Sequence, residues 1–94
     1  VMVDLSRREV LKGELRVILT PTEGKLMAVF LENRNQVLRH QELVMKVQGY
    51  ETSDWEAAEV LRPLISRLRQ KLATFPGGEN WIASVRGTGY VLNI

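Results

Sequence analysis

Cysteine is absent from the sequence, and histidine occurs once, at position 40. Without thiols there is no disulfide, no thiolate nucleophile and no thiolate metal site, so a metal centre would need carboxylates alone. No nucleophile is paired with a base, and no set of metal ligands is recognisable. The chain is therefore not expected to be an enzyme, or to bind a metal, a cofactor or a small-molecule ligand.

Long apolar runs and a secretory leader are also missing. No apolar stretch approaches the roughly 18 residues of a transmembrane helix, and no signal-peptide pattern opens the chain. We therefore expect no membrane contact and a cytoplasmic location. The chain begins at Val1, without an initiator methionine and already in a β-prone run, which indicates a domain excised from a longer protein.

Three isolated features do not indicate a ligand site. A phosphate-binding glycine loop needs a following helix, and only five residues follow Gly89. The lone His40 is expected at the surface, in the first turn of a helix. Trp55 and Trp81 could stack on bases, but packing in the core or at its rim is the expected role of both.

The composition is that of one ordinary globular domain, with 94 residues, 45% apolar and 26% charged. The net charge of +2 is small but unevenly distributed. Residues 1–60 carry eight Lys and Arg against ten Asp and Glu, whereas residues 61–94 carry five against one. A basic C-terminal third suits binding to a polyanion.

Hydrophobic periodicity and turn signals predict the order of the elements. Short strands at residues 1–5, 8–11 and 15–19 predict an antiparallel meander. Helices are expected over residues 21–32 and 40–48, and a third ends near residue 74. Strands at 81–85 and 90–94 form a hairpin. This order predicts an α+β fold over residues 1–94, a winged helix-turn-helix with an N-terminal antiparallel β-meander, three helices and a C-terminal β-hairpin wing.

Helix boundaries are marked by three local signals. Thr20 with Glu23 forms a capping-box pattern, and Pro21 lies where its missing N–H has no cost. Ser53 with Glu56 repeats the pattern before the third helix. Gly49 is placed to end the second helix in a left-handed conformation.

The stretch Leu61–Leu72 organises the rest of the chain. At 100° per residue its apolar side chains fall within an arc of roughly 100°, the width of a core-facing stripe. They are Ala57, Leu61, Leu64, Ile65, Leu68 and Leu72. The opposite face carries Arg62, Pro63, Ser66, Arg67 and Gln70. Two guanidiniums, an amide and a hydroxyl on an exposed helix predict a surface that can follow a groove.

Pro63 leaves two interpretations of this third helix open. Inside a helix, proline removes a hydrogen bond and clashes with the preceding turn, which costs about 3 kcal/mol of helix stability. The helix is then either kinked there, or it begins near Leu61 after a separate turn at residues 55–60. In the second interpretation, which is slightly preferred, Pro63 lies in the first turn.

Two motifs resemble the C-terminal effector domain of OmpR/PhoB-type response regulators. They are Ile65-Ser66-Arg67-Leu68-Arg69-x-Lys71-Leu72 and Val85-Arg86-Gly87-x-Gly89-Tyr90. The frame Leu19-Thr20-x-x-Glu23-x-x-Leu26-Met27 extends the resemblance over almost the whole chain. It implies sequence-specific binding of double-stranded DNA, usually at direct repeats by two domains arranged head to tail, and transcription regulation downstream of an N-terminal receiver.

The resemblance also implies roles for individual positions. Recognition-helix contacts with bases or phosphates would come from Arg62, Pro63, Ser66, Arg67, Arg69 and Gln70, with Arg67 as the main base-reading residue. Wing contacts would come from Ser84, Arg86 and Thr88, with Arg86 in the minor groove. The loop between helices two and three would face RNA polymerase through Gln48, Gly49, Tyr50, Glu51, Thr52, Ser53 and Asp54.

Alternatives remain for both residues and function. Arg69 lies near the edge of the apolar arc, so it could pair with Glu23 or Glu42 instead of a phosphate. The family commonly has histidine where this chain has Leu64, which removes a phosphate contact. A winged-helix module that binds a protein through Leu64, Trp55 and the 48–54 loop, with weakened or lost DNA readout, is therefore the alternative function.

Overall fold

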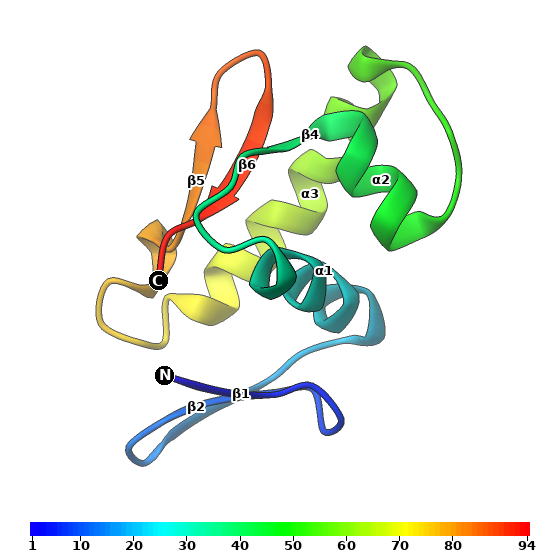
Figure 1. Ribbon diagram of the computed structural model, residues 1–94. Coiled ribbons are helices and arrows are strands. Elements are labelled where there is room, and N and C mark those ends of the chain that lie inside the picture. Colours follow the sequence, from blue (N-terminus) through cyan, green and yellow to red (C-terminus); the bar gives the residue numbers. More distant parts are fainter.

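Two three-stranded antiparallel sheets flank three helices in the computed structural model, which describes residues 1–94 (Figure 1). The first sheet contains β1 (Met2–Asp4), β2 (Glu9–Lys12) and β3 (Leu15–Ile18) in that order. The helices are α1 (Pro21–Glu32), α2 (His40–Gln48) and α3 (Asp54–Leu72). The second sheet has the order β4 (Leu38–Arg39), β6 (Gly89–Leu92) and β5 (Ile82–Val85), and a short 3-10 helix, η1 (Gly78–Asn80), follows α3.

The predicted fold class is confirmed, and two short elements are additions to it. The meander and the hairpin form as expected, with Val10 opposite Val17 and Val85 opposite Gly89. Strand β4 was not predicted because two residues carry too little periodicity to be recognised. It pairs with β6 and so ties the hairpin to the start of α2. No helix has both the length and the apolar character needed to cross a bilayer.

The core lies between the helices and is closed by the two sheets. Seventeen buried residues form one apolar cluster. Helix α3 supplies Ala57, Leu61, Ile65, Leu68 and Leu72, which confirms the predicted stripe except that Leu64 is only partly buried. At the end of α3, the buried Phe75 stacks on Trp81 with ring centroids 5.7 Å apart. Trp81 is partly buried against the core cluster, which confirms its predicted packing in the core or at its rim.

The capping box of α1 and the glycine end of α2 form as predicted, whereas at α3 only the Ser53 half of the predicted box forms. The N–H of Glu23 donates to Thr20 Oγ1 at 3.2 Å, and the N–H of Thr20 donates to Glu23 Oε1 at 2.9 Å, which completes the capping box of α1. Ser53 Oγ accepts the N–H of Glu56 at 3.2 Å before α3. Gly49 ends α2 with φ +82°, a conformation that disfavours any side chain.

The preferred interpretation of Pro63 is wrong. Helix α3 starts at Asp54 and runs continuously through Pro63 to Leu72, about 28 Å at 1.5 Å per residue. Two features favour the longer helix: Ser53 caps it, and Ala57 and Leu61 are buried on successive turns. Pro63 itself is exposed, so the carbonyl it leaves unpaired, four residues earlier at the exposed Glu59, can bind water.

Candidate nucleic-acid interface

The outward face of α3 presents Arg67, Ser66 and Gln70. All three are exposed, and no hydrogen bond or ion pair within the chain engages their side chains. The buried stripe of Ile65 and Leu68 fixes the rotation of the helix around Arg67. The guanidinium of Arg67 therefore projects from a well-anchored turn with its five N–H donors free for a ligand.

Arg62 and Pro63 lie on the same outward face, nearer the start of α3. Arg62 Nη1 is 2.9 Å from Glu59 Oε1, and both side chains are largely exposed. An exposed pair of this kind contributes about 0–1 kcal/mol, so a phosphate can replace the carboxylate at little cost. The residues predicted for this face therefore do lie on one face of α3. Arg62 pairs with Glu59, and Arg67 has no partner within the chain.

Arg69 is held by the wing instead of projecting into solvent. Its Nε and Nη2 donate to the carbonyl of Ile82 at 3.0 and 2.7 Å, and Nη2 also donates to Ser84 Oγ at 3.1 Å. Its guanidinium carbon lies 5.7 Å from the ring centroid of Tyr90. The alternative pairing with Glu23 or Glu42 is therefore wrong, because both carboxylates have other partners.

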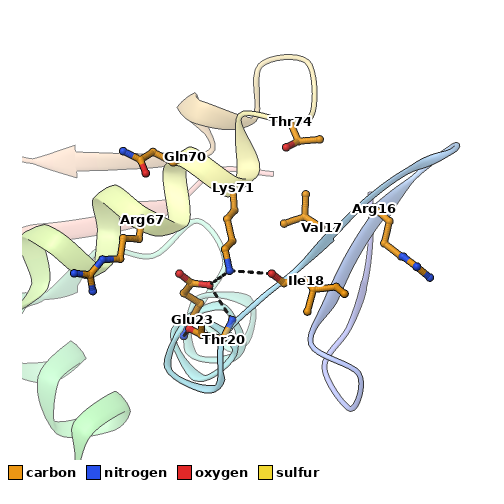
Figure 2. A pocket seen from close by; sticks show the side chains of 9 residues that line it. All are labelled: Arg16, Val17, Ile18, Thr20, Glu23, Arg67, Gln70, Lys71 and Thr74. Atoms are coloured by element: carbon orange, nitrogen blue, oxygen red, sulfur yellow. Dashed lines mark hydrogen bonds and ion pairs between the residues drawn. The ribbon is translucent and has the colours of Figure 1, made fainter.

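Glu23 is paired with Lys71, a residue that sequence reasoning did not single out. Lys71 Nζ lies 2.6 Å from Glu23 Oε1 and 2.9 Å from the carbonyl of Ile18 (Figure 2). Burial raises the pKa of Glu23, but hydrogen bonds from Lys71 and the Thr20 N–H, with the charge of Lys71, outweigh it and leave the pKa below its ordinary value. The network joins α3, α1 and β3.

A cleft of about 570 Å³ runs beside this network, between β3 and the C-terminal half of α3. Its walls are formed by Arg16, Val17, Ile18, Thr20, Glu23, Arg67, Gln70, Lys71 and Thr74 (Figure 2). Its one carboxylate is neutralised by Lys71. The cleft thus extends the basic character of α3 toward the first sheet.

The wing carries Arg86 at its tip. Arg86 is exposed and has no polar partner within the chain, and Gly87 turns the hairpin with φ +74°. Thr88 is half-buried, and its carbonyl accepts the N–H of His40 at 3.1 Å. Gly89 packs against β4 so closely that a Cβ there would lie 1.8 Å from the carbonyl oxygen of Leu38. The hairpin is consequently fixed at its base and open at Arg86.

His40 is less exposed than predicted. Its side chain is 12% exposed and packs edge-on against Tyr90, with ring centroids 5.7 Å apart. Nδ1 lies 3.6 Å from Asp54 Oδ1 and has no hydrogen-bond partner. His40 and Arg69 therefore both pack against the ring of Tyr90 on β6.

The segment predicted to face polymerase forms a short connection between two helices. Gln48 ends α2 and Asp54 begins α3, so only residues 49–53 are outside helices. The side chain of Gln41 donates to the carbonyl of Thr52 at 2.8 Å, which ties the connection to α2. Tyr50 is 44% exposed and Trp55, just beyond the segment, is 73% exposed. The expected packing of Trp55 in or beside the core is therefore wrong.

A helix–connection–helix unit whose second helix has an exposed outer face, beside a β-hairpin with a basic tip, defines a winged helix-turn-helix domain. A sequence profile of the family described as "Transcriptional regulatory protein, C terminal" matches residues 13–92. The chain belongs to this family, the winged-helix DNA-binding domains of OmpR/PhoB-type response regulators. The family is a DNA-binding and not an enzymatic one, as predicted.

Individual relatives agree with this assignment. The KDP operon transcriptional regulatory protein KdpE of Escherichia coli is 38% identical over 90 residues, which are 96% of this chain and 39% of KdpE. The probable transcriptional regulator ycf27 of Guillardia theta is 33% identical over 89 residues, 95% of this chain and 35% of that protein. The chain therefore spans well under half the length of these relatives.

Solved structures share the fold over nearly the whole chain. The C-terminal domain of the nisin resistance regulator NsrR superimposes with a TM-score of 0.78 at 27% identity, covering 99% of this chain and 91% of that one. The DNA-binding domain of Klebsiella pneumoniae RstA, solved in complex with the RstA box, gives 0.79 at 23% identity, covering 97% and 88%.

Proposed function

We propose that this chain binds double-stranded DNA with α3 in the major groove and the wing in the adjacent minor groove, as the output domain of a two-component response regulator. One observation carries the proposal: Arg67 and Arg86 are exposed guanidiniums without partners in the chain, and each lies on an element fixed at its base. An unpaired cation on a rigid element is pre-organised to bind a polyanion.

Arg67 is the main base-reading residue in this proposal. Arginine bonds guanine O6 and N7 in bidentate fashion, which is worth roughly 1–3 kcal/mol of discrimination. Gln70, on the same face, has the donor and acceptor that match adenine. Arg62, Pro63 and Ser66 lie toward the start of α3, where they face bases or the neighbouring phosphates.

Arg86 reads groove width instead of base identity. An arginine inserted into a narrow minor groove responds to its enhanced negative potential. Ser84, on β5, and Thr88, in the turn just before β6, lie behind the tip, near the expected phosphates. Ser84 accepts from Arg69, which leaves its hydroxyl proton free to donate to a phosphate oxygen.

Partners beyond DNA are assigned to other parts of the chain. We place RNA polymerase at the segment from Gln48 to Asp54, because its backbone is tied to α2 while Tyr50 and the adjacent Trp55 are exposed. Direct repeats would be bound by two copies arranged head to tail. A phosphorylatable receiver is placed upstream of Val1, in line with the greater length of the relatives.

The alternative is a winged helix that binds a protein and reads no DNA. Trp55, at 73% exposure, favours it, because an exposed tryptophan is a typical centre of a protein interface. Salt dependence separates the two functions. Neutralised phosphates give a linear fall of log K with log salt, at a slope of about −0.9 per contact.

The test begins with selection of a preferred site from randomised duplexes by the 94-residue chain. Affinities for that site and for a random duplex are then compared for wild type, Arg67→Ala and Arg7→Ala. We expect Arg67→Ala to lose about tenfold to a hundredfold on the selected site and little on the random duplex. Arg7, exposed in the turn between β1 and β2, is the matched control and should change neither.

Equal losses on both duplexes would contradict the role of Arg67. A flat salt dependence, or no duplex binding at low salt, would contradict DNA binding as a whole and support the protein-binding alternative.

A further inference from the structure

The hydrogen bonds between α3 and the wing all come from one side chain. Arg69 donates two hydrogen bonds to the carbonyl of Ile82 and one to Ser84 Oγ, at 2.7–3.1 Å. Both acceptors are on β5, which is an edge strand of the second sheet and has no strand neighbour on that side. The recognition helix and the wing are therefore joined directly through a charged group.

The chemistry of this contact requires arginine. The Nε–H and Nη2–H groups lie in one plane and meet a single carbonyl as a fork, while the same Nη2 reaches the hydroxyl two residues further on. The flat guanidinium also faces the ring of Tyr90 on the paired strand β6. A lysine ammonium carries the same charge but cannot reproduce this fork.

The bonds from Arg69 to Ile82 lie at the base of the hairpin, away from its tip. Arg86 follows Ile82 by four residues, a distance of about 13 Å along an extended strand. From the other side, the N–H of His40 donates to the carbonyl of Thr88 at 3.1 Å, and β4 pairs with β6. With the opposite side fixed by α2 and β4, Arg69 sets the angle between the hairpin and α3.

We propose that Arg69 is a positioning residue for DNA recognition, which fixes Arg86 relative to Arg67 so that the major-groove and minor-groove contacts form in one register. It acts through β5 and not by contacting a phosphate, the role implied by the family resemblance. The inference rests on the proposed DNA binding, because it concerns how two DNA contacts are coupled.

The test compares two substitutions at this position with one in the wing. Affinity for the selected site is measured for Arg69→Lys, Arg69→Gln and Arg86→Ala, and for the double variant Arg69→Lys/Arg86→Ala. We expect Arg69→Lys and Arg69→Gln to lose about tenfold each, because neither restores the fork. In the Arg86→Ala background, Arg69→Lys should lower the affinity little further, because the wing contact that Arg69 positions is already absent.

The salt dependence supplies a second readout. If Arg69 is a positioning residue, Arg69→Lys lowers the slope of log K against log salt by no more than Arg86→Ala does. If Arg69 contacts a phosphate instead, Arg69→Lys would bind like wild type. Only Arg69→Gln would then lose affinity, with the slope of log K against log salt reduced by about one. That pattern, or additive losses in the double variant, would overturn the proposal.

Thermal unfolding of every variant, measured at the salt concentration of the binding assay, checks that each one is folded. If Arg69→Lys is not folded at the assay temperature, Arg69→Gln replaces it in both backgrounds, because it also removes the two bonds to the carbonyl of Ile82. Its loss should then disappear in the Arg86→Ala background, and an undiminished loss would overturn the proposal. Wild type and Arg67→Ala are measured in parallel, so that failure of DNA binding itself is distinguished from failure of this inference.

Discussion

The two halves of α3 are held in different ways. In the C-terminal half, Arg69 bonds to β5 and Lys71 bonds to α1 and to the end of β3. In the N-terminal half, the polar contacts of Arg62 and Glu56 are made with residues within four positions in the sequence. The reading residue Arg67 therefore belongs to the half whose position is defined by distant parts of the chain.

The difference shows how a small domain stabilises an exposed helix. Long-range contacts fix the rotation and tilt of α3 where base edges are to be read. Local contacts, which include the exposed pair of Arg62 and Glu59, fix only the helical conformation itself. We expect substitutions of the polar residues Arg69 and Lys71 to affect stability and geometry together, and substitutions of the exposed polar residues of the N-terminal half to affect mainly the local helix.

The largest effect is expected from truncating the core side chain Leu68. Leu68 is 0% exposed, so Leu68→Ala should lower the free energy of unfolding by about 2–5 kcal/mol through lost burial and a cavity. Leu64→Ala, in a partly buried position one turn earlier, should lower it by about 1 kcal/mol. Urea unfolding measures both, and equal losses would show that the difference in burial between the two positions does not set the cost of truncation.

A stabilising change is expected at Pro63. Pro63→Ala restores an N–H donor to the carbonyl of Glu59 inside a continuous helix, which should raise the free energy of unfolding by about 1–3 kcal/mol. The gain would come from the N-terminal half alone. Urea unfolding of the variant checks it, and an unchanged midpoint would mean that the proline is already accommodated without loss.

A smaller effect, of about 1 kcal/mol, is expected from the charge of Glu23. Its pKa is lowered in the folded chain, so its contribution to stability is present above the ordinary value of 4.5 and is lost as the pH falls through the folded pKa. Glu23→Gln should therefore flatten the acid limb of a stability–pH curve. Glu59→Gln, in the exposed pair with Arg62, is the matched control for the loss of one surface carboxylate.

The pKa of Asp4 is also lowered, chiefly by the hydrogen bond from Ser6. Asp4 is present in both variants, so its contribution cancels in the comparison. An identical acid limb in Glu23→Gln and wild type would contradict the role assigned to the Glu23–Lys71 pair.

Features with a local cause were predicted from the sequence. Thr20, Gly49 and Ser53 cap or end helices through interactions with their own neighbours, and the apolar stripe of α3 follows from helical periodicity. The two family motifs added the fold and the DNA-binding class. Exposure of Arg67 followed from its place opposite the stripe.

Features with a tertiary cause were missed or wrongly predicted. The continuity of α3 through Pro63 depends on packing around Ala57 and Leu61, which outweighs the local cost of proline. The partners of Arg69 and Lys71 lie 13 and 48 positions away in the sequence, and periodicity carries no signal for such pairs. The contribution of Arg67 and Arg86 to DNA binding stays a prediction.

The bonds from Arg69 to β5 also bear on how the chain behaves in crowded or concentrated solution. An edge strand with free backbone groups is a template on which another molecule can add a strand and start aggregation. In the second sheet, the carbonyl of Ile82 is occupied by the Arg69 side chain, and β4, at the opposite edge, is only two residues long. One outward-facing backbone group of β5 is thereby withdrawn from intermolecular pairing, and the two residues of β4 offer little length to an added strand.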